Sequence, residues 1–290
     1  MRRRLLALVT ALLVLAGLGW GASRIAADVR GDDHDGRRTT ATRTGPRRPL
    51  PTLRIVFPEG FTRRQMAGRI AAVNGIAKRK RHVGTRLSPR AYLRITSSSP
   101  FPRPFGGAGT TRALEGFLFP ALYEFTPATS TRQLVDDQLA AFQERWTRID
   151  LRYARSKNLT PYDVLIIASM IEEEVKAPRE RRLVSAVIYN RLHNRMRLGI
   201  DATIRYALDV PPTKSLTLAE LRNPTPYNTR IHRGLPPTPI TNPGVASMQA
   251  AAHPARVSYL FFVRKPDKVH HFFTASERAF TNYQKTHGYG

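Results

Sequence analysis

The amino-acid sequence predicts an α+β fold behind an N-terminal transmembrane helix. Residues 5–23 are uncharged and largely apolar, and a run of this length can cross the hydrocarbon core of a bilayer. Farther along, Leu53, Ile55 and Phe57 recur at every second position, as in a strand. Helix start signals then recur through the rest of the chain. The 290 residues, 41% of them hydrophobic, suffice for one large domain or two small ones.

Residues 1–27 are predicted to be a retained membrane anchor. Arg2, Arg3 and Arg4 precede the apolar run, and Trp20 lies near its far end. Because basic residues favour the cytoplasmic side, everything after Arg24 is expected to lie outside the cytoplasm. A cleaved signal peptide is the alternative, but no clean Ala-x-Ala-like site follows. We therefore expect a single-pass protein of the cell membrane with its N-terminus in the cytoplasm.

A flexible tether and a small module are expected next. Residues 28–51 are rich in charge, Thr, Gly and Pro and nearly free of large apolar residues, as in a solvated linker. Residues 52–110 combine the strand at 53–57, a helix with apolar positions from Phe61 to Val73, and a second helix opened by Ser88 and Pro89. The Ser-, Pro- and Gly-rich residues 96–110 mark the expected boundary of a second domain, residues 111–290.

Helices dominate the expected second domain. One helix should run from about Thr131 to Trp146, and a capping box at Thr160–Asp163 opens another that ends near Pro178. Further features are a helix from about Arg179 to Asn194, helices opened by Thr217 with Glu220 and by Asn242 with Pro243, a Pro-rich loop between them, a hairpin formed by "VSYLFFVRK" and "VHHFF", and a last helix capped by Thr274 and Glu277.

The stretch "IASMIEEEVK" places Glu172, Glu173 and Glu174 behind a fully apolar run. Small residues, Ala168 and Ser169, lie one helical turn before Glu172 and leave space above its carboxylate. A partly desolvated carboxylate holds a proton near neutral pH, as a general acid for a glycosidic oxygen requires. The pattern alone favours the other interpretation, a solvated acidic helix end paired with nearby basic residues.

Glycoside hydrolysis normally takes two carboxylates, and no second acid stands at an obviously linked spacing. Glu115, Glu124 and Asp201 are the candidates. A mechanism with one glutamate would need the substrate to supply its own nucleophile, as in transglycosylation to an internal anhydro ring.

Other chemistries and partners fit the sequence less well. There is no cysteine and no His-Glu-x-x-His motif, and His270 and His271 of the expected strand point to opposite faces. We therefore expect neither a metal nor a cofactor. The net charge of +26 favours a polyanionic partner, but no nucleic-acid-binding motif is present, so nucleic acid is not an expected partner.

Several motifs occur together and in a fixed order. They are "VFPEG", "EGFLFPALYEF", "IASMIEEEV", "VIYNRL", "MRLGIDATIRYAL", "TPYNTRIHRGLPPTPITNPG" and "AAAHPARVSYLFFV". From about Leu53 to the C-terminus the chain thereby resembles the YceG-like family of endolytic murein transglycosylases, membrane-anchored bacterial enzymes that cut nascent peptidoglycan strands. The resemblance implies a LysM-like module at 52–110, opened by "VFPEG", and a catalytic domain at 111–290.

The resemblance also implies the site. The first acid after the Ala-Ser-x-x tetrad is the family's catalytic glutamate, which is Glu172, with Glu173 at the surface and Glu174 as a support. The implied substrate-binding residues are Glu115, Ser169, Asn190, Arg191, Asp201, Thr203, Tyr227, Asn228 and Thr229. Two departures from the family pattern, Gly199 with Ala202 and Ala121 with Leu122, affect substrate detail rather than the reaction type.

The implied reaction is cleavage of the bond between N-acetylmuramic acid and N-acetylglucosamine, which leaves 1,6-anhydro ends. Peptidoglycan glycan strands are the expected substrate, the membrane holds the anchor, and cell-wall synthases are candidate partners. The alternatives are a muramidase that uses water, with Asp201 or Glu115 as second carboxylate, a non-catalytic wall-binding protein, and a membrane-tethered nucleic-acid binder.

Overall fold

The structure, a computed structural model, describes residues 50–102, 104–105 and 111–288. The expected anchor and nearly all of the expected tether lie outside this part of the chain. The described residues belong to one compact unit. None of their helices combines the length and the apolar character that crossing a membrane requires.

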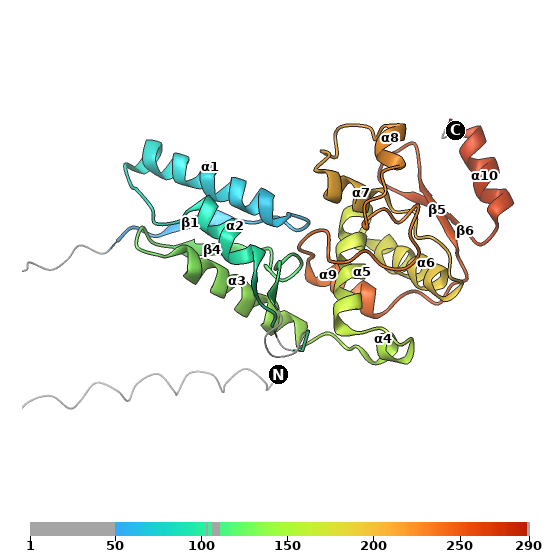
Figure 1. Cartoon of the computed structure of the whole chain (residues 1–290), viewed down its shortest axis with the longest axis horizontal. Coiled ribbons are helices and arrows are strands. Elements are labelled where there is room, and N and C mark those ends of the chain that lie inside the picture. The colour runs from blue at the N-terminus through green and yellow to red at the C-terminus, as the bar shows by residue number, and fades with distance from the viewer. Residues whose placement is uncertain (1–49, 103, 106–110, 289–290) are drawn as a thin grey trace, which may run out of the picture. The chain divides into compact units, whose positions relative to one another are not determined.

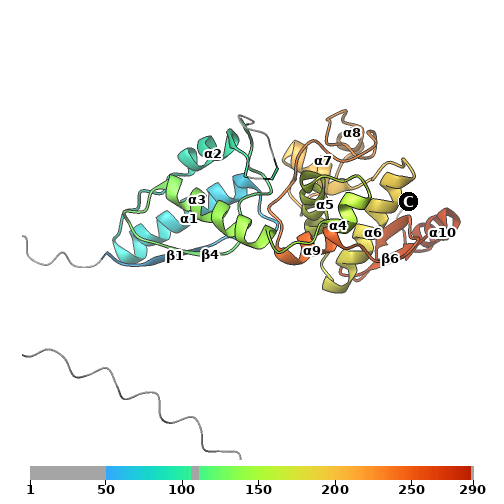
Figure 2. The same ribbon diagram turned by 90° about the horizontal axis from the view of Figure 1, so that it is seen from below.

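The first half of this unit is a two-stranded sheet with helices on one side. Strand β1 (Leu53–Val56) pairs antiparallel with β4 (Leu122–Phe125). Helices α1 (Arg63–Arg81), α2 (Pro89–Ser97) and α3 (Thr131–Trp146) complete it, and Figure 2 shows all three on one side of the β1–β4 ribbon. The strand at 53–56 and both early helices are confirmed. The second strand of this sheet follows residue 110, where the sequence placed a boundary.

Alternation explains the packing of β1. Leu53 and Ile55 are buried, whereas Arg54 and Val56 are exposed on the uncovered face. Thr62 and Gln65 form a capping box that starts α1, and Met66 and Ile70 of that helix are fully buried. The segment expected to be irregular, residues 96–110, carries one very short strand, β2 (Ser99–Pro100), which pairs with another, β3 (Thr111–Arg112), directly after it.

The second half is built around helix α5 (Pro161–Glu174), which Figure 1 shows among its neighbours. Every residue from Val164 to Ile171 is buried, because the helix packs against α6 (Arg181–His193), α7 (Asp201–Leu208) and α9 (Val245–Ala252). The remaining elements are α4 (Arg152–Ser156), the 3-10 helix η1 (Pro178–Glu180), α8 (Leu218–Leu221), the hairpin of β5 (Phe261–Arg264) and β6 (His271–Thr274), and α10 (Glu277–Thr286).

The capping predictions are partly confirmed. Thr160–Asp163 and Thr217–Glu220 are capping boxes. Asn242, predicted to open α9, does not cap it: Gly244 is the N-cap and no side chain caps the helix. The last helix is capped by Ser276 rather than by Thr274. Asn242 is used elsewhere because its carboxamide hydrogen-bonds a distant loop.

Candidate active site

The three glutamates end helix α5 and have different surroundings. Glu172 Oε2 accepts a hydrogen bond from the Gly244 N–H at 3.0 Å. The Glu59 carboxylate lies beside Gly244, where any Cβ would collide with it. Burial raises the pKa of Glu59, and the charge of Glu172 adds to the effect. Glu172 thus belongs to an acidic pair around Gly244.

Glu173 and Glu174 instead line a cavity of about 650 Å³ at the end of α5. Helix α7 and the β5–β6 hairpin supply much of the rest of its wall. Its other polar lining residues include Arg191, Asp201, Arg205, Arg230, Arg264 and His271. Glu172 is not among its lining residues. Glu173 also lines a second cavity of about 310 Å³, together with Thr62 and Tyr206.

Burial changes the acidity of both cavity glutamates. It raises the pKa of Glu173 to about 7, with the charges of Glu174 and Glu172 acting in the same direction. The prediction that Glu173 is a surface residue is therefore wrong: the side chain is half-buried because the last turn of α5 is covered on that side as well. Burial also raises the pKa of Glu174, and the Arg264 guanidinium opposes this. Both groups favour the protonated form more than an exposed glutamate does.

Of these two glutamates, Glu174 has the closer contact with a basic side chain. Its side chain is 15% exposed, and its Oε2 lies 3.8 Å from Arg264 Nη2. The same Nη2 donates a hydrogen bond to the Glu174 carbonyl oxygen at 3.2 Å. Elsewhere in the cavity wall, Asp201 accepts from Arg230 Nε at 2.5 Å and from Nη2 at 3.0 Å. The cavity therefore combines a protonatable carboxyl with several fixed charges.

Of the substrate-binding residues implied by the sequence, the structure places Asp201 and Arg191 at this cavity. Arg191 also has a structural task, since it donates to the carbonyl oxygens of Leu260 and Leu198, each at 2.5 Å. Burial lowers the pKa of Arg191.

Three more of those residues hold the Pro-rich loop. Thr229 Oγ1 accepts from the Ile200 N–H at 2.9 Å, and Thr203 Oγ1 lies 3.2 Å from it. Asn228 donates to the carbonyl oxygens of Leu221 and Asn223. Thr203, Asn228 and Thr229 are all buried. The Thr229 bonds fix the loop onto the start of α7, and the Asn228 bonds hold it to the end of α8 and the residues after it.

Ser169, Asn190 and Tyr227 also bond within the protein. Ser169 Oγ accepts from the Ile240 N–H at 3.0 Å. Asn190 donates to the carbonyl oxygens of Val257 and Tyr259. The Tyr227 hydroxyl lies 2.8 Å from Thr238 Oγ1. Their side chains thus support the segments that surround the cavity.

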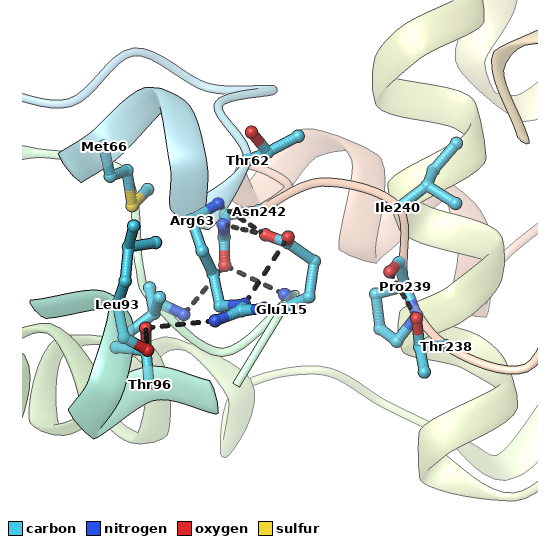
Figure 3. Close-up of polar contacts among 12 residues, drawn as sticks. Thr62, Arg63, Met66, Leu93, Thr96, Glu115, Thr238, Pro239, Ile240 and Asn242 are labelled. Carbon is cyan, nitrogen blue, oxygen red and sulfur yellow. Dashed lines mark hydrogen bonds and ion pairs between the residues drawn. The ribbon is translucent and has the colours of Figure 1, made fainter. Parts of the chain in front are cut away.

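The Glu115 carboxylate is hydrogen-bonded within the protein rather than free (Figure 3). It is 2% exposed and accepts hydrogen bonds from the Arg63 N–H at 2.9 Å, from Asn242 Nδ2 at 2.8 Å and from the Tyr206 hydroxyl at 3.2 Å. Burial raises the pKa of Glu115 to about 7 against the lowering effect of the Arg63 guanidinium. The same Asn242 accepts from the N–H groups of Gly116 and Leu118, each at 2.9 Å.

The sequence interpretation did not include several residues of the cavity. Arg230 directly follows the motif residues Tyr227 to Thr229, so the motif itself was a signal for it. Arg264 and His271 carry no such signal, because their place depends on how the hairpin packs. Glu59 lies in "VFPEG", a motif that indicates only the opening of the LysM-like module.

Taken together, the fold and the cavity define a class: α+β proteins with a buried helix that delivers a protonatable carboxylate to a polar cavity. A model of the YceG-like family matches residues 39–286. The chain belongs to the YceG-like family.

Similar proteins agree with this membership. The endolytic murein transglycosylase of Streptococcus pneumoniae is 30% identical over 239 residues, which cover 75% of this chain and 41% of that protein. The endolytic murein transglycosylase of Bacillus subtilis is 35% identical over 153 residues, 52% of this chain and 42% of that protein. The chain thus spans about two fifths of the length of these relatives.

A solved structure has the same fold. The crystal structure of a yceG-like protein from Listeria monocytogenes superposes with a TM-score of 0.68 at 28% identity, and the match covers 81% of this chain and 76% of that chain.

Proposed function

We propose that the protein is a peptidoglycan lytic transglycosylase that cleaves the bond between N-acetylmuramic acid and N-acetylglucosamine within glycan strands. The names of the similar proteins from S. pneumoniae and B. subtilis support the reaction class. The polar cavity at the end of α5 supports a hydroxyl-rich and charged ligand.

Glu174 is the residue that the geometry supports best as the acid. Glu173 and Glu174 both line the larger cavity, and burial raises the pKa of each. The observation that carries the assignment is that, of the three glutamates, Glu174 is the one with a cation within 4 Å among the described residues, Arg264 at 3.8 Å. The assignment of Glu172 from the sequence stays a prediction, and a test of both is given at the end of the Discussion.

The proposed reaction returns the glutamate to its starting state. Protonated Glu174 donates its proton to the glycosidic oxygen as the bond from C1 of the muramoyl residue to that oxygen breaks. The carboxylate then accepts the proton of the muramoyl 6-hydroxyl as O6 bonds to C1 and closes the 1,6-anhydro ring. No water is consumed. Arg264, 3.8 Å from the Glu174 carboxylate, stabilises the intervening anion.

The mass of the product tests the reaction. Digestion of purified glycan strands by the full chain should release fragments that end in 1,6-anhydro-N-acetylmuramic acid. A muramidase would add one water to each new end. Asp201 lines the same cavity as Glu174 and keeps this second candidate function open. Fragments that all carry the additional water would contradict the lytic reaction and favour the muramidase.

We also propose that the first half of the unit is a LysM-like module that holds glycan near the cavity. The succession of β1, α1 and α2, with β4 following the very short strands β2 and β3 and pairing antiparallel with β1, supports it. Binding of the full-length Glu174→Gln variant to insoluble peptidoglycan, measured by co-sedimentation, tests it. Recovery of all the protein in the supernatant would contradict glycan binding.

A further inference from the structure

The β5–β6 hairpin presents Arg264 and His271 on one face. These residues are direct cross-strand partners, and Phe262 is paired with Phe273 two positions along. Because side chains alternate along a strand, the four share a face. Phe262 and Phe273 pack against the core, so this face looks inward.

A largely buried carboxylate, that of Glu180, holds His271 in place. His271 Nδ1 lies 2.6 Å from Glu180 Oε2, and the side chains of His271 and Glu180 are 1% and 11% exposed. The His271 backbone N–H also donates to both oxygens of Glu180, at 3.1 Å each. Glu180 precedes α6 but makes no capping bond with it. The hydrogen bonds of the Glu180 carboxylate therefore go to the hairpin.

The hairpin is thus attached at both ends of the segment from Glu174 to Glu180. Arg264 contacts the carboxylate and the carbonyl oxygen of Glu174. His271, opposite Arg264 in the hairpin, contacts Glu180 at the far end of η1. A shift of the hairpin at His271 would carry Arg264 with it, because the two residues are paired through the backbone.

We propose that the Glu180–His271 pair positions Arg264 against Glu174 and so sets the acidity of the acid that the cavity contains. This inference rests on the proposed function, in which Glu174 is that acid. Glu180 and His271 act through Arg264, so they are positioning residues rather than catalytic ones.

The protonation state of His271 fits this task. Nδ1 faces the Glu180 carboxylate and serves as the donor, which leaves Nε2 as the acceptor. Among the described residues, Nε2 is buried without a hydrogen-bond partner. Burial lowers the pKa of His271, although Glu180 opposes this. A neutral imidazole bonds Glu180 without adding a second cation beside Arg264.

Other charged groups also act on Glu174, so the effect of Arg264 must be isolated. They are Glu173 on α5, Arg191 on α6, Asp201 and Arg205 on α7, and Arg230 on the loop that follows Tyr227. None of these contacts His271 or Glu180 through a hydrogen bond or ion pair in the described part of the chain. Changes at the pair should therefore reach Glu174 through Arg264.

The test is the pH dependence of kcat/KM with glycan strands, measured with the full chain. Activity needs protonated Glu174, so its pKa sets the basic limb. His271→Phe removes the side-chain bond to Glu180 and leaves the two backbone bonds, and Arg264→Gln removes the cation. Since a neighbouring guanidinium lowers a carboxyl pKa, each variant should move the basic limb upward by about one pH unit. The double variant should shift no farther than Arg264→Gln alone.

Two variants serve as controls. His271→Asn keeps a donor near the position of Nδ1 and should restore part of the wild-type profile. His270→Asn changes the neighbouring histidine, whose Nδ1 lies 2.9 Å from Asp267 at the surface, and should leave the profile unchanged. A uniform loss of activity in His271→Phe without any shift of the limb would overturn the proposal and leave a merely structural role.

A direct titration separates this proposal from the assignment of Glu174 as the acid. In the full chain with carbon-13-labelled glutamate, the Glu174 carboxyl should titrate higher in His271→Phe than in the wild type. That result would support positioning even if Glu174→Gln kept full activity. An unchanged Glu174 titration in His271→Phe would contradict positioning, whatever the outcome for the reaction.

Discussion

At the residue scale, three chemically identical side chains, Glu172, Glu173 and Glu174, lie within the last turn of α5. Successive positions on a helix point about 100° apart, so only one or two of the glutamates can face a given cavity. The sequence shows that the preceding turns are apolar, but it does not show which side the rest of the chain leaves open. The Gly244 N–H donates to the Glu172 carboxylate, whereas the hairpin and α7 form walls of the cavity that Glu174 lines.

Glu115 gives a prediction for stability. Its pKa is raised from 4.5 to about 7 in the folded chain, so the folded state holds this proton more tightly than the unfolded state does. The resulting contribution is fully present below pH 4.5 and is lost as the pH rises through about 7. In the wild type the free energy of unfolding should therefore fall between pH 4.5 and 7.5, and in Glu115→Gln this fall should be smaller by roughly 1–3 kcal/mol.

Urea unfolding of both proteins at several pH values measures this difference. Glu124→Gln, which removes an exposed carboxylate paired with Arg54, is the matched control and should behave as the wild type does. An identical pH dependence in wild type and Glu115→Gln would show that Glu115 does not retain its proton.

At the element scale, the features that local sequence controls were predicted best. A Pro at the first helical position placed α2, a capping box placed α5, and hydrophobic periodicity placed α3, because such signals act over one or a few turns. Helix α7 and the partner of β1 were not predicted, since an eight-residue helix and a pairing across some 70 residues depend on tertiary contacts. Asn242 is the instructive error: a good cap residue by type, it is used for long-range bonds.

Asn242 should be important for joining these elements. Its side chain accepts from the N–H groups of Gly116 and Leu118 and donates to Glu115 and to the Phe61 carbonyl oxygen. Asn242→Ala leaves buried groups unpaired and should lower the free energy of unfolding by about 2–4 kcal/mol. Urea denaturation measures it. Asn194→Ala, which removes one bond of an exposed side chain, should cost under about 1 kcal/mol, and equal losses in the two variants would contradict the account.

The candidate site was predicted in part, for the same reason. The motifs identified the segments that surround the cavity, and Asp201 and Arg191 do line it. Most of the other motif residues bond to backbone groups that hold those segments, such as Thr229 to Ile200. A motif does not distinguish a side chain that contacts a ligand from one that supports the loop beside it.

At the scale of the whole molecule, the expected anchor determines where the reaction would occur. The run at residues 5–23 predicts that the intact chain stays in the membrane fraction after alkaline washing, because hydrophobic insertion resists high pH. Removal of residues 1–27 should release the protein into the soluble fraction of fractionated cells, as seen by immunoblotting. A truncated protein that remained in the membrane fraction would show that another part of the chain holds it there.

Comparison of two glutamine variants tests the central claim most directly. Glu174→Gln and Glu172→Gln, each purified as the full chain and checked for folding by circular dichroism, are compared with the wild type for release of 1,6-anhydro products from glycan strands. The account predicts that Glu174→Gln lowers the rate by about 10²-fold or more and that Glu172→Gln retains most of it. Full activity in Glu174→Gln with loss in Glu172→Gln would contradict the account and return the acid to Glu172.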